Sequence, residues 1–415
     1  MTKFQLFTAL TTMTAFTAFA AQVLFRLKGS LGMAVAGAAM SLVAFIVGLI
    51  WPEVGQHTET LFSSINYPDA VFHGMLCFLI FAAAMHVNLR DIYRWKITVS
   101  VLATVGVLVS TLVVAFVAYL FCKLDNLNIP FPWLLVFGAL ISPTDPVAVM
   151  ALLKDLNADK DLETKIAAES LLNDGTAIVL FSVFLAMATD ATAPSAVGVA
   201  GLFMLKVLGG LALGVVLGLV GHYLLKVVND PPTSVVMTLA YALGGYSLGE
   251  SLSVSGPLVA AAMGLVVGHG RHSSMDAATQ AKLVPFWEMF DELLNMLLFM
   301  LVGMSLLALP ESVPAILFGV AAIASALVGR FFSVSLPLTL ISKTIKPIPV
   351  GTVEAMVWGG VRGGVSLAMV LSLPESPYKP FLVSGTWAVV MFSLLVQAPT
   401  LGKVLRFYGL VNNKT

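Results

Sequence analysis

Charged residues are scarce in this sequence. Asp, Glu, Lys and Arg make up 11% of its 415 residues, whereas a soluble domain carries about 25%. The 22 basic residues equal the 22 acidic ones, so the chain lacks the excess of positive charge that binds a phosphate backbone. The only two cysteines, Cys77 and Cys122, lie in apolar stretches and provide neither a disulfide framework nor a metal-binding spacing. These shortages exclude a soluble enzyme, a disordered protein and a nucleic-acid-binding protein.

Long apolar runs fill the chain instead. Hydrophobic residues account for 59% of it, and the mean hydropathy is +0.96. Because a helix needs about 20 apolar residues to cross a bilayer, we expect an all-α polytopic membrane protein with thirteen transmembrane helices. The predicted spans are residues 5–25, 31–50, 68–88, 97–122, 130–152, 162–188, 195–228, 233–251, 255–269, 286–308, 313–342, 350–373 and 379–402. The ninth is short, and the seventh is long enough for one strongly tilted span or two helices.

The lysines and arginines are divided unequally between the two sides of these spans. Sixteen of the 22 fall in one set of alternate loops, three fall in the other set, and Lys206, Arg330 and Arg362 lie at membrane depth. The positive-inside rule therefore predicts that the N-terminus lies outside and the C-terminus in the cytoplasm. The number of spans suggests a multi-pass protein of the plasma (inner) membrane. Alternatively, Ala18-Phe19-Ala20 is a signal-peptide cleavage site, which would leave twelve spans.

A few ionisable residues lie inside the predicted spans, where charge is costly and therefore marks function. Asp145 lies in the fifth span and is flanked by Pro143 and Pro146. Two prolines so close together should unwind that helix, and unwound backbone at membrane depth indicates a water-filled or protein-lined cavity. Arg362 lies in the twelfth span between two Gly-Gly pairs. Broken helices at matching places predict two unwound crossing helices within inverted repeats of spans 1–6 and 8–13, which is typical of a transport site.

The sixth span carries the candidate ligands. Glu169 and Asn173 are four residues apart and share a helix face, as do Ser170 and Asp174. Carboxylate, hydroxyl and amide oxygens suit a hard alkali cation, and the lack of nearby His or Cys disfavours a transition metal. A carboxylate buried away from water can hold either a proton or a cation, which is the minimal chemistry of an exchanger.

Simpler interpretations apply to several polar and small residues. Glu169 is more easily explained as the structural partner of Arg330 or Arg362 than as an ion ligand, because buried arginines need counter-charges. Gly210, Gly214 and Gly218 form a small-residue face that favours helix packing. Three acidic residues near the start of the tenth span are explained by favourable charge at a helix N-terminus; they are Glu288, Asp291 and Glu292.

Three motifs together resemble the monovalent cation:proton antiporter superfamily. They are Ser-Pro-Thr-Asp-Pro at 142–146, Glu-Ser-Leu-Leu-Asn-Asp-Gly at 169–175 and Gly-Gly-Val-Arg-Gly-Gly-Val-Ser at 359–366. The pair Asn173-Asp174 resembles the NhaP/NHE-type Na⁺/H⁺ exchangers, and the resemblance covers essentially the whole chain. It implies a homodimer that works by elevator-type alternating access. It also implies a dimerisation subdomain (1–95 and 233–308), a core subdomain (96–190 and 313–410) and a linker helix (195–228).

The resemblance also assigns roles to residues. Asp174 would carry the ion and the proton, and Asp145, Thr144 and Ser170 would complete the Na⁺ site. Asn173 replaces the second aspartate of the electrogenic branch, which suggests electroneutral exchange. Glu169 would pair with an arginine, with Arg330 the first choice and Arg362 neutralising the broken helix ends. No cofactor is expected beyond the transported Na⁺ (or Li⁺) and H⁺.

Other functions remain open at this stage. The same residues suit K⁺/H⁺ exchange, and a sodium-coupled symporter for an organic anion is a further alternative that would need a substrate-sized cavity. An intramembrane aspartyl protease needs two carboxylates that share a proton. Asp145 between prolines, and a chain without a Gly-x-Gly-Asp motif, argue against it.

Overall fold

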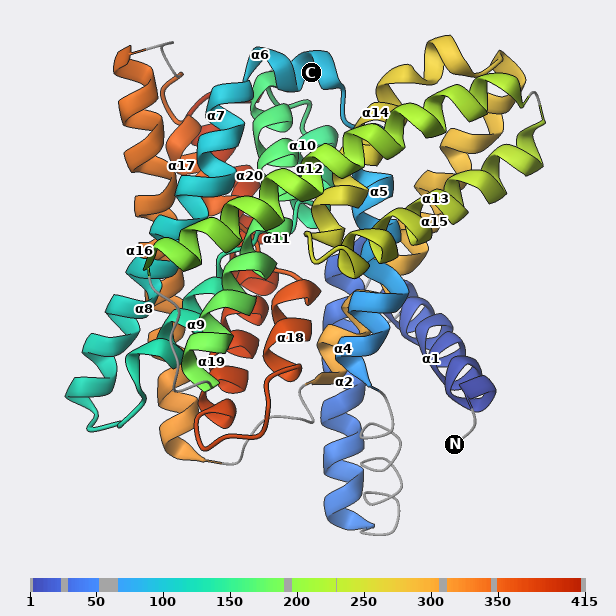
Figure 1. The fold of residues 1–415 in the computed structure, drawn as a ribbon. Helices are drawn as coiled ribbons and strands as arrows, with labels where there is room; N and C mark the ends of the chain where they lie inside the picture. The colour runs from blue at the N-terminus through green and yellow to red at the C-terminus, as the bar shows by residue number, and fades with distance from the viewer. Residues whose placement is uncertain are drawn as a thin grey trace.

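The computed structural model describes residues 3–23, 29–51, 66–189, 196–228, 230–305, 312–344 and 349–411. Throughout these ranges the chain is helical, with one isolated β-bridge between Ala158 and Val411 (Figure 1). In chain order the helices, with η marking π-helical turns, are α1 (Lys3–Val23), α2 (Gly29–Ile50), α4 (Tyr67–Asp69), η1 (Ala70–Met75), α5 (Leu76–His86), α6 (Leu89–Arg94), α7 (Lys96–Val101), η2 (Leu102–Gly106), α8 (Val107–Leu124), α9 (Phe131–Ile141), α10 (Val147–Asp155), α11 (Lys160–Thr189), α12 (Ala196–Val227), α13 (Pro231–Ser251), α14 (Gly256–Ser274), α15 (Ala277–Met304), α16 (Val313–Thr344), α17 (Thr352–Trp358), α18 (Gly364–Leu371), α19 (Lys379–Phe392), η4 (Ser393–Gln397) and α20 (Ala398–Phe407).

The chain is a multi-pass membrane protein with an all-helical fold. A helix satisfies its own backbone hydrogen bonds, which lipid cannot do. Within the described residues, six helical stretches are long and apolar enough to cross a bilayer, namely Tyr67–His86, Lys96–Leu124, Lys160–Thr189, Ala200–Val227, Val313–Ser342 and Lys379–Phe407. The seventh predicted span is a single helix, α12, and not two.

The helices pack in two groups. In the first group α12 lies against α14, α14 against α5, and α15 against α2. In the second group α16 packs against α8 and α19, while α9 packs against α8 and α11. Helices α11 and α18 contact members of both groups, so the residues that they carry lie between the two.

Glycines allow the closest approaches in the first group. A side chain at Gly214 on α12 would place its Cβ 2.5 Å from the Val259 carbonyl oxygen of α14. A Cβ at Gly303 on α15 would lie 2.5 Å from the Ala38 nitrogen of α2. Small residues let helix backbones approach in lipid, and the packing interpretation of the glycines on α12 agrees with this contact.

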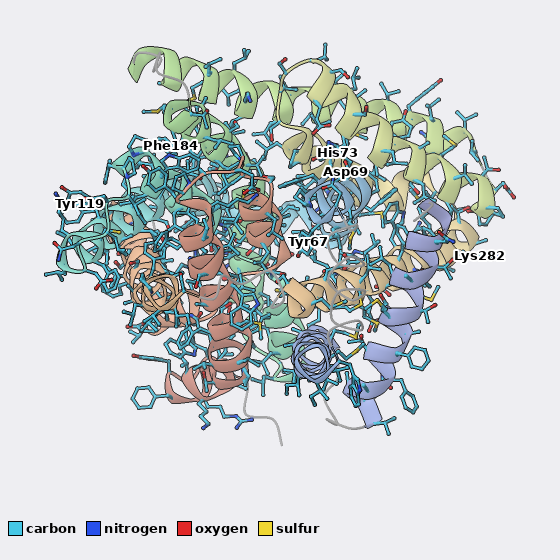
Figure 2. The ribbon with its side chains drawn as sticks, turned by 90° about the horizontal axis from the view of Figure 1, so that it is seen from below. Tyr67, Asp69, His73, Tyr119, Phe184 and Lys282 are labelled. Carbon is cyan, nitrogen blue, oxygen red and sulfur yellow. The ribbon has the colours of Figure 1, made fainter. Side chains whose placement is uncertain are left out.

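Helix α12 is inclined strongly to α2 and α16. It crosses the molecule diagonally in Figure 1. In Figure 2, where the molecule is seen from below, α2 and α16 are viewed end-on while α12 lies across the picture. The same view shows Asp69 and His73 together beside Tyr67, and the His73 Nδ1 atom lies 2.8 Å from Asp69 Oδ1 on this exposed turn.

Two interpretations of charged residues were wrong. Helix α15 starts at Ala277, where the Asp276 side chain accepts a hydrogen bond from the Thr279 N–H at 2.9 Å. Glu288 therefore lies 11 residues into the helix, beyond the first turn to which the helix-dipole effect is confined. Lys165 is one of the sixteen basic residues counted with the first set of loops, although it falls just inside the predicted span 162–188. It is buried in α11 with its Nζ 3.8 Å from the centre of the Trp95 ring, a cation–π contact. Four of the basic residues assigned to loops lie outside the described residues; they are Arg26, Lys28, Lys346 and Lys414.

Candidate functional site

Two interruptions of helical structure meet in the centre of the molecule. Helix α9 ends at Ile141 and α10 begins at Val147, and α17 and α18 are separated in the same way by residues 359–363. The Asp145 N–H donates a hydrogen bond of 2.7 Å to the Val361 carbonyl oxygen, which joins the two non-helical stretches. Gly363 permits this contact, because a Cβ there would lie 2.1 Å from Asp145 Oδ2.

Arg362 satisfies the backbone that the interruption exposes. Its Nη1 donates to the carbonyl oxygens of Ser142 and, at 2.9 Å, Pro143. These carbonyls follow the C-terminal end of α9, where a positive charge is favourable and the oxygens need donors. The Arg362 N–H donates to Ser393 Oγ at 3.0 Å on η4, which holds the arginine in place. The Arg362 guanidinium therefore binds backbone oxygens and not a carboxylate.

A network of neutral side chains connects the first interruption to α11. Thr144 Oγ1 lies 2.9 Å from Ser170 Oγ, and either atom can donate. Asn173 Nδ2 donates to Thr144 Oγ1 at 2.8 Å, and the Thr144 N–H donates to Asn173 Oδ1 at 3.4 Å. All three side chains are buried. Asn173 therefore fixes the position of the Thr144 hydroxyl.

Glu169 pairs with Arg330, the first of the two arginines considered above. Arg330 Nη1 donates to Glu169 Oε1, and Nη2 donates to Oε2 at 2.9 Å, so the pair is bidentate. Arg330 also donates from Nε and Nη2 to the Met356 carbonyl oxygen at 3.2 and 3.1 Å. Both side chains are buried, so this ion pair holds α11, α16 and α17 together.

A cavity of about 690 Å³ separates the predicted site residues into two sets. Asp174, Asp145, Thr144 and Ser170 line it, whereas Asn173, Glu169, Arg330 and Arg362 lie behind its wall. Asp174 and Asp145 are half-buried, and their charges are close enough to interact. Among the described residues, no hydrogen-bond donor contacts the Asp174 carboxyl group. Asp145 Oδ1 accepts from the Val147 N–H at 2.9 Å.

The lining of the cavity is strongly acidic. Besides Lys154, Lys160 and His86, the charged or titratable lining side chains are seven carboxylates: Asp91, Asp145, Glu163, Asp174, Glu288, Asp291 and Glu292. The field in such a cleft attracts cations and repels anions. No three His, Cys, Asp or Glu side chains converge as a metal site within the described ranges, so the chemistry here is that of carboxylates and hydroxyls.

Several lining residues received no role in the prediction from sequence, among them Asp291, Asn295 and Ser366. The first two belong to a polar stripe on α15 at positions 288, 291, 292 and 295. This spacing defines one helix face, so the sequence contained the signal. Ser366 was visible within the third motif but received no role.

Comparison with known proteins places this geometry in a family. The sequence profile of the family described as "Sodium/hydrogen exchanger, transmembrane" matches residues 41–407. The chain belongs to the sodium/hydrogen exchanger family. That family comprises transporters and not enzymes.

Individual exchangers agree over nearly the full length. The chain is 36% identical over 406 residues to the Na⁺/H⁺ antiporter NhaP of Pseudomonas aeruginosa, covering 96% of this chain and 95% of that one. It is 30% identical to the Na⁺/H⁺ antiporter NhaH of Halobacillus aidingensis, over 90% and 91% of the two chains. The solved structure of the sodium proton antiporter MjNhaP1 of Methanocaldococcus jannaschii at pH 8 superimposes with a TM-score of 0.76 and 18% identity, over 98% and 99% of the chains. This last match shows the shared fold.

Proposed function

We propose that this protein exchanges Na⁺ (or Li⁺) for H⁺ across the plasma membrane. The observation that carries the proposal is the acidic cavity. Asp174 and Asp145 line it, together with the hydroxyl-bearing residues Thr144 and Ser170. The two buried arginines do not neutralise these carboxylates, since Arg330 binds Glu169 and Arg362 binds backbone oxygens. Family membership and the names of the relatives support the same activity.

Competition at one carboxylate explains the exchange. Asp174 binds a proton or a cation but not both, so loading one ion displaces the other. Asp145, Thr144 and Ser170 supply further oxygens to the hard cation. Asn173 adds no charge because an amide is neutral, and its Nδ2 donates to Thr144 Oγ1. With Asp174 as the one carboxylate that exchanges its ion, the exchange is electroneutral.

The architecture that we propose has thirteen spans in inverted repeats, with the fifth and twelfth spans unwound where they cross. The core subdomain (96–190 and 313–410) would move as an elevator against the dimerisation subdomain (1–95 and 233–308) of a homodimer, with linker helix 195–228 between them. The two packing groups of helices support this division. The N-terminus would lie outside and the C-terminus in the cytoplasm. The cavity, bordered by Lys154 and Lys160, would therefore face the cytoplasm.

Two alternatives differ in their support. K⁺/H⁺ exchange needs the same carboxylates, and only transport data rank the alkali cations. A sodium-coupled symporter for an organic anion would have room for its substrate, because the cavity volume of 690 Å³ lies in the range of small-molecule pockets. However, seven carboxylates around that space would repel an anionic substrate.

The test uses proteoliposomes that contain a pH-sensitive dye and an imposed inside-acid gradient, with the membrane potential clamped. Na⁺, Li⁺ or K⁺ is added in turn to wild type, Asp174→Asn and the control Asp69→Asn, whose carboxylate lies on an exposed turn. We expect cation-dependent alkalinisation in wild type and the control and none in Asp174→Asn. Exchange retained in Asp174→Asn would contradict the site, and a wild type unresponsive to every cation would contradict the function. Rates that do not change when a potential is imposed would support electroneutrality.

A further inference from the structure

Ser366 places a third element of the fold at the cavity. It is the third residue of α18, directly after the non-helical residues 359–363, and its side chain is 1% exposed. Helix α18 packs against α9, α11 and α15, and the last two of these also border the cavity. Ser366 itself lines that cavity together with Asp174 and Asp145. The residue therefore adds a hydroxyl to the wall of the space in which a cation would bind.

The Ser366 hydroxyl has no hydrogen-bond partner among the described residues. This is unusual, because most buried side-chain polar atoms have a partner. Ser372, the residue that follows α18, donates to the Met369 oxygen at 2.7 Å. The other hydroxyls at the site, those of Thr144 and Ser170, contact each other. A buried hydroxyl without a partner is unfavourable and calls for an explanation.

We propose that Ser366 Oγ is an additional ligand of the transported cation and helps to set the preference among alkali cations. A hydroxyl offers lone pairs that suit a hard cation and adds no charge, so it alters affinity without altering the charge carried per cycle. Its partner is then the ion, which explains why none of the residues that the structure describes supplies one. This inference rests on the proposed function, since it assigns a further ligand to the same site.

Ser110 provides a matched control. It lies on α8, is buried, and likewise has a hydroxyl without a partner, but it does not line the cavity. Replacing either serine by alanine removes an unsatisfied polar group, so neither change should lower stability. Ser366→Thr retains the hydroxyl and serves as the rescue variant.

The experiment measures initial rates of exchange in proteoliposomes against Na⁺ and Li⁺ concentration, together with the melting temperature of each variant in detergent. For Ser366→Ala we expect the KM for Na⁺ to rise about five- to tenfold. We also expect an altered ratio of the Li⁺ and Na⁺ KM values and an unchanged or higher melting temperature. Ser366→Thr should recover the wild-type ratio, and Ser110→Ala should leave both KM values unchanged.

Different outcomes overturn different statements. Unchanged KM values in an active Ser366→Ala would refute the role of Ser366 and leave the exchanger assignment standing. An equal change of the KM values in Ser110→Ala would also refute that role. The same holds for a fall in the melting temperature of Ser366→Ala that is large enough to explain its lower rate. A wild type that exchanges no alkali cation for protons would overturn both proposals together.

Discussion

The carboxylates of α11 fall into two kinds: one is paired with an arginine, and the other faces the cavity. Glu169 and Arg330 are held, because each oxygen of the carboxylate accepts from the guanidinium and the pair lies behind the cavity wall. Asp174 faces the cavity, although it lies only five residues further along α11. Helix α11 thus carries one carboxylate, Glu169, that stabilises the fold and a second, Asp174, that is available for transport.

Removal of the Glu169 charge tests this distinction. Glu169→Gln leaves Arg330 buried without a counter-charge, so we expect the free energy of unfolding to fall by about 3–5 kcal/mol. Thermal unfolding in detergent measures the change. Glu375→Gln is the matched control, since Glu375 pairs with Lys379 at the surface and is 92% exposed, where such pairs contribute about 0.5 kcal/mol or less. Normal melting with lost transport would mean that Glu169 contacts the ion.

At the scale of elements, the site depends on two places where helices stop. Residues 142–146 and 359–363 are joined by the hydrogen bond between Asp145 and Val361 and by Arg362. Gly363 is required at this junction because of space and not because of backbone conformation. Its φ of −125° is accessible to any residue. Asp145, however, occupies the position that a Cβ at residue 363 would take.

Addition of one methyl group at the junction should therefore impair transport. Gly363→Ala forces the Asp145 carboxyl to move, and we expect the exchange rate to fall by about 10²-fold, as for other displacements near 1 Å. Gly244→Ala on α13 is the control, since a Cβ there meets nothing within 4 Å. Proteoliposome assays of both variants give the comparison. A wild-type rate in Gly363→Ala would show that the position of Asp145 is unimportant.

Local chemistry explains what could be predicted from the sequence at this scale. Pro143 and Pro146 interrupt a helix by themselves, and the Gly-Gly pairs weaken one because glycine loses more backbone entropy in a helix, so the prediction of an interruption needed no tertiary information. The start of α15 at Ala277 was missed because the apolar pattern begins only near residue 286, although Asp276 caps the helix earlier. The lack of a hydrogen-bond partner for the Ser366 hydroxyl among the described residues could not be predicted. It depends on which side chains the tertiary fold places near that residue.

At the scale of the whole molecule, the proposed orientation assigns the acidic cavity to one side of the membrane. Its rim includes Lys154 and Lys160, which belong to the loops assigned to the cytoplasm. Leu124, at the end of α8 beside Lys123, belongs to the loops assigned to the exterior and is 83% exposed.

Labelling with a membrane-impermeant maleimide tests the orientation. Ala151 is exposed and lines the cavity, so we expect Ala151→Cys to react in inside-out vesicles only. Leu124→Cys should react in right-side-out vesicles only. The native Cys77 and Cys122 are buried and provide a low background. The reverse pattern would invert the topology.

The inclination of α12 links the protein to the thickness of its bilayer. Its apolar stretch Ala200–Val227 has 28 residues and measures about 42 Å, whereas the hydrocarbon core is about 30 Å thick. Matching the two requires a tilt of roughly 45°, well beyond the average of about 20°. Since α12 is fastened to α14 through Gly214 and also contacts α11, a thicker bilayer that draws α12 upright would strain the connection between the two groups of helices. Lipid chain length should therefore tune the turnover of this protein through hydrophobic mismatch, without any change at the ion site.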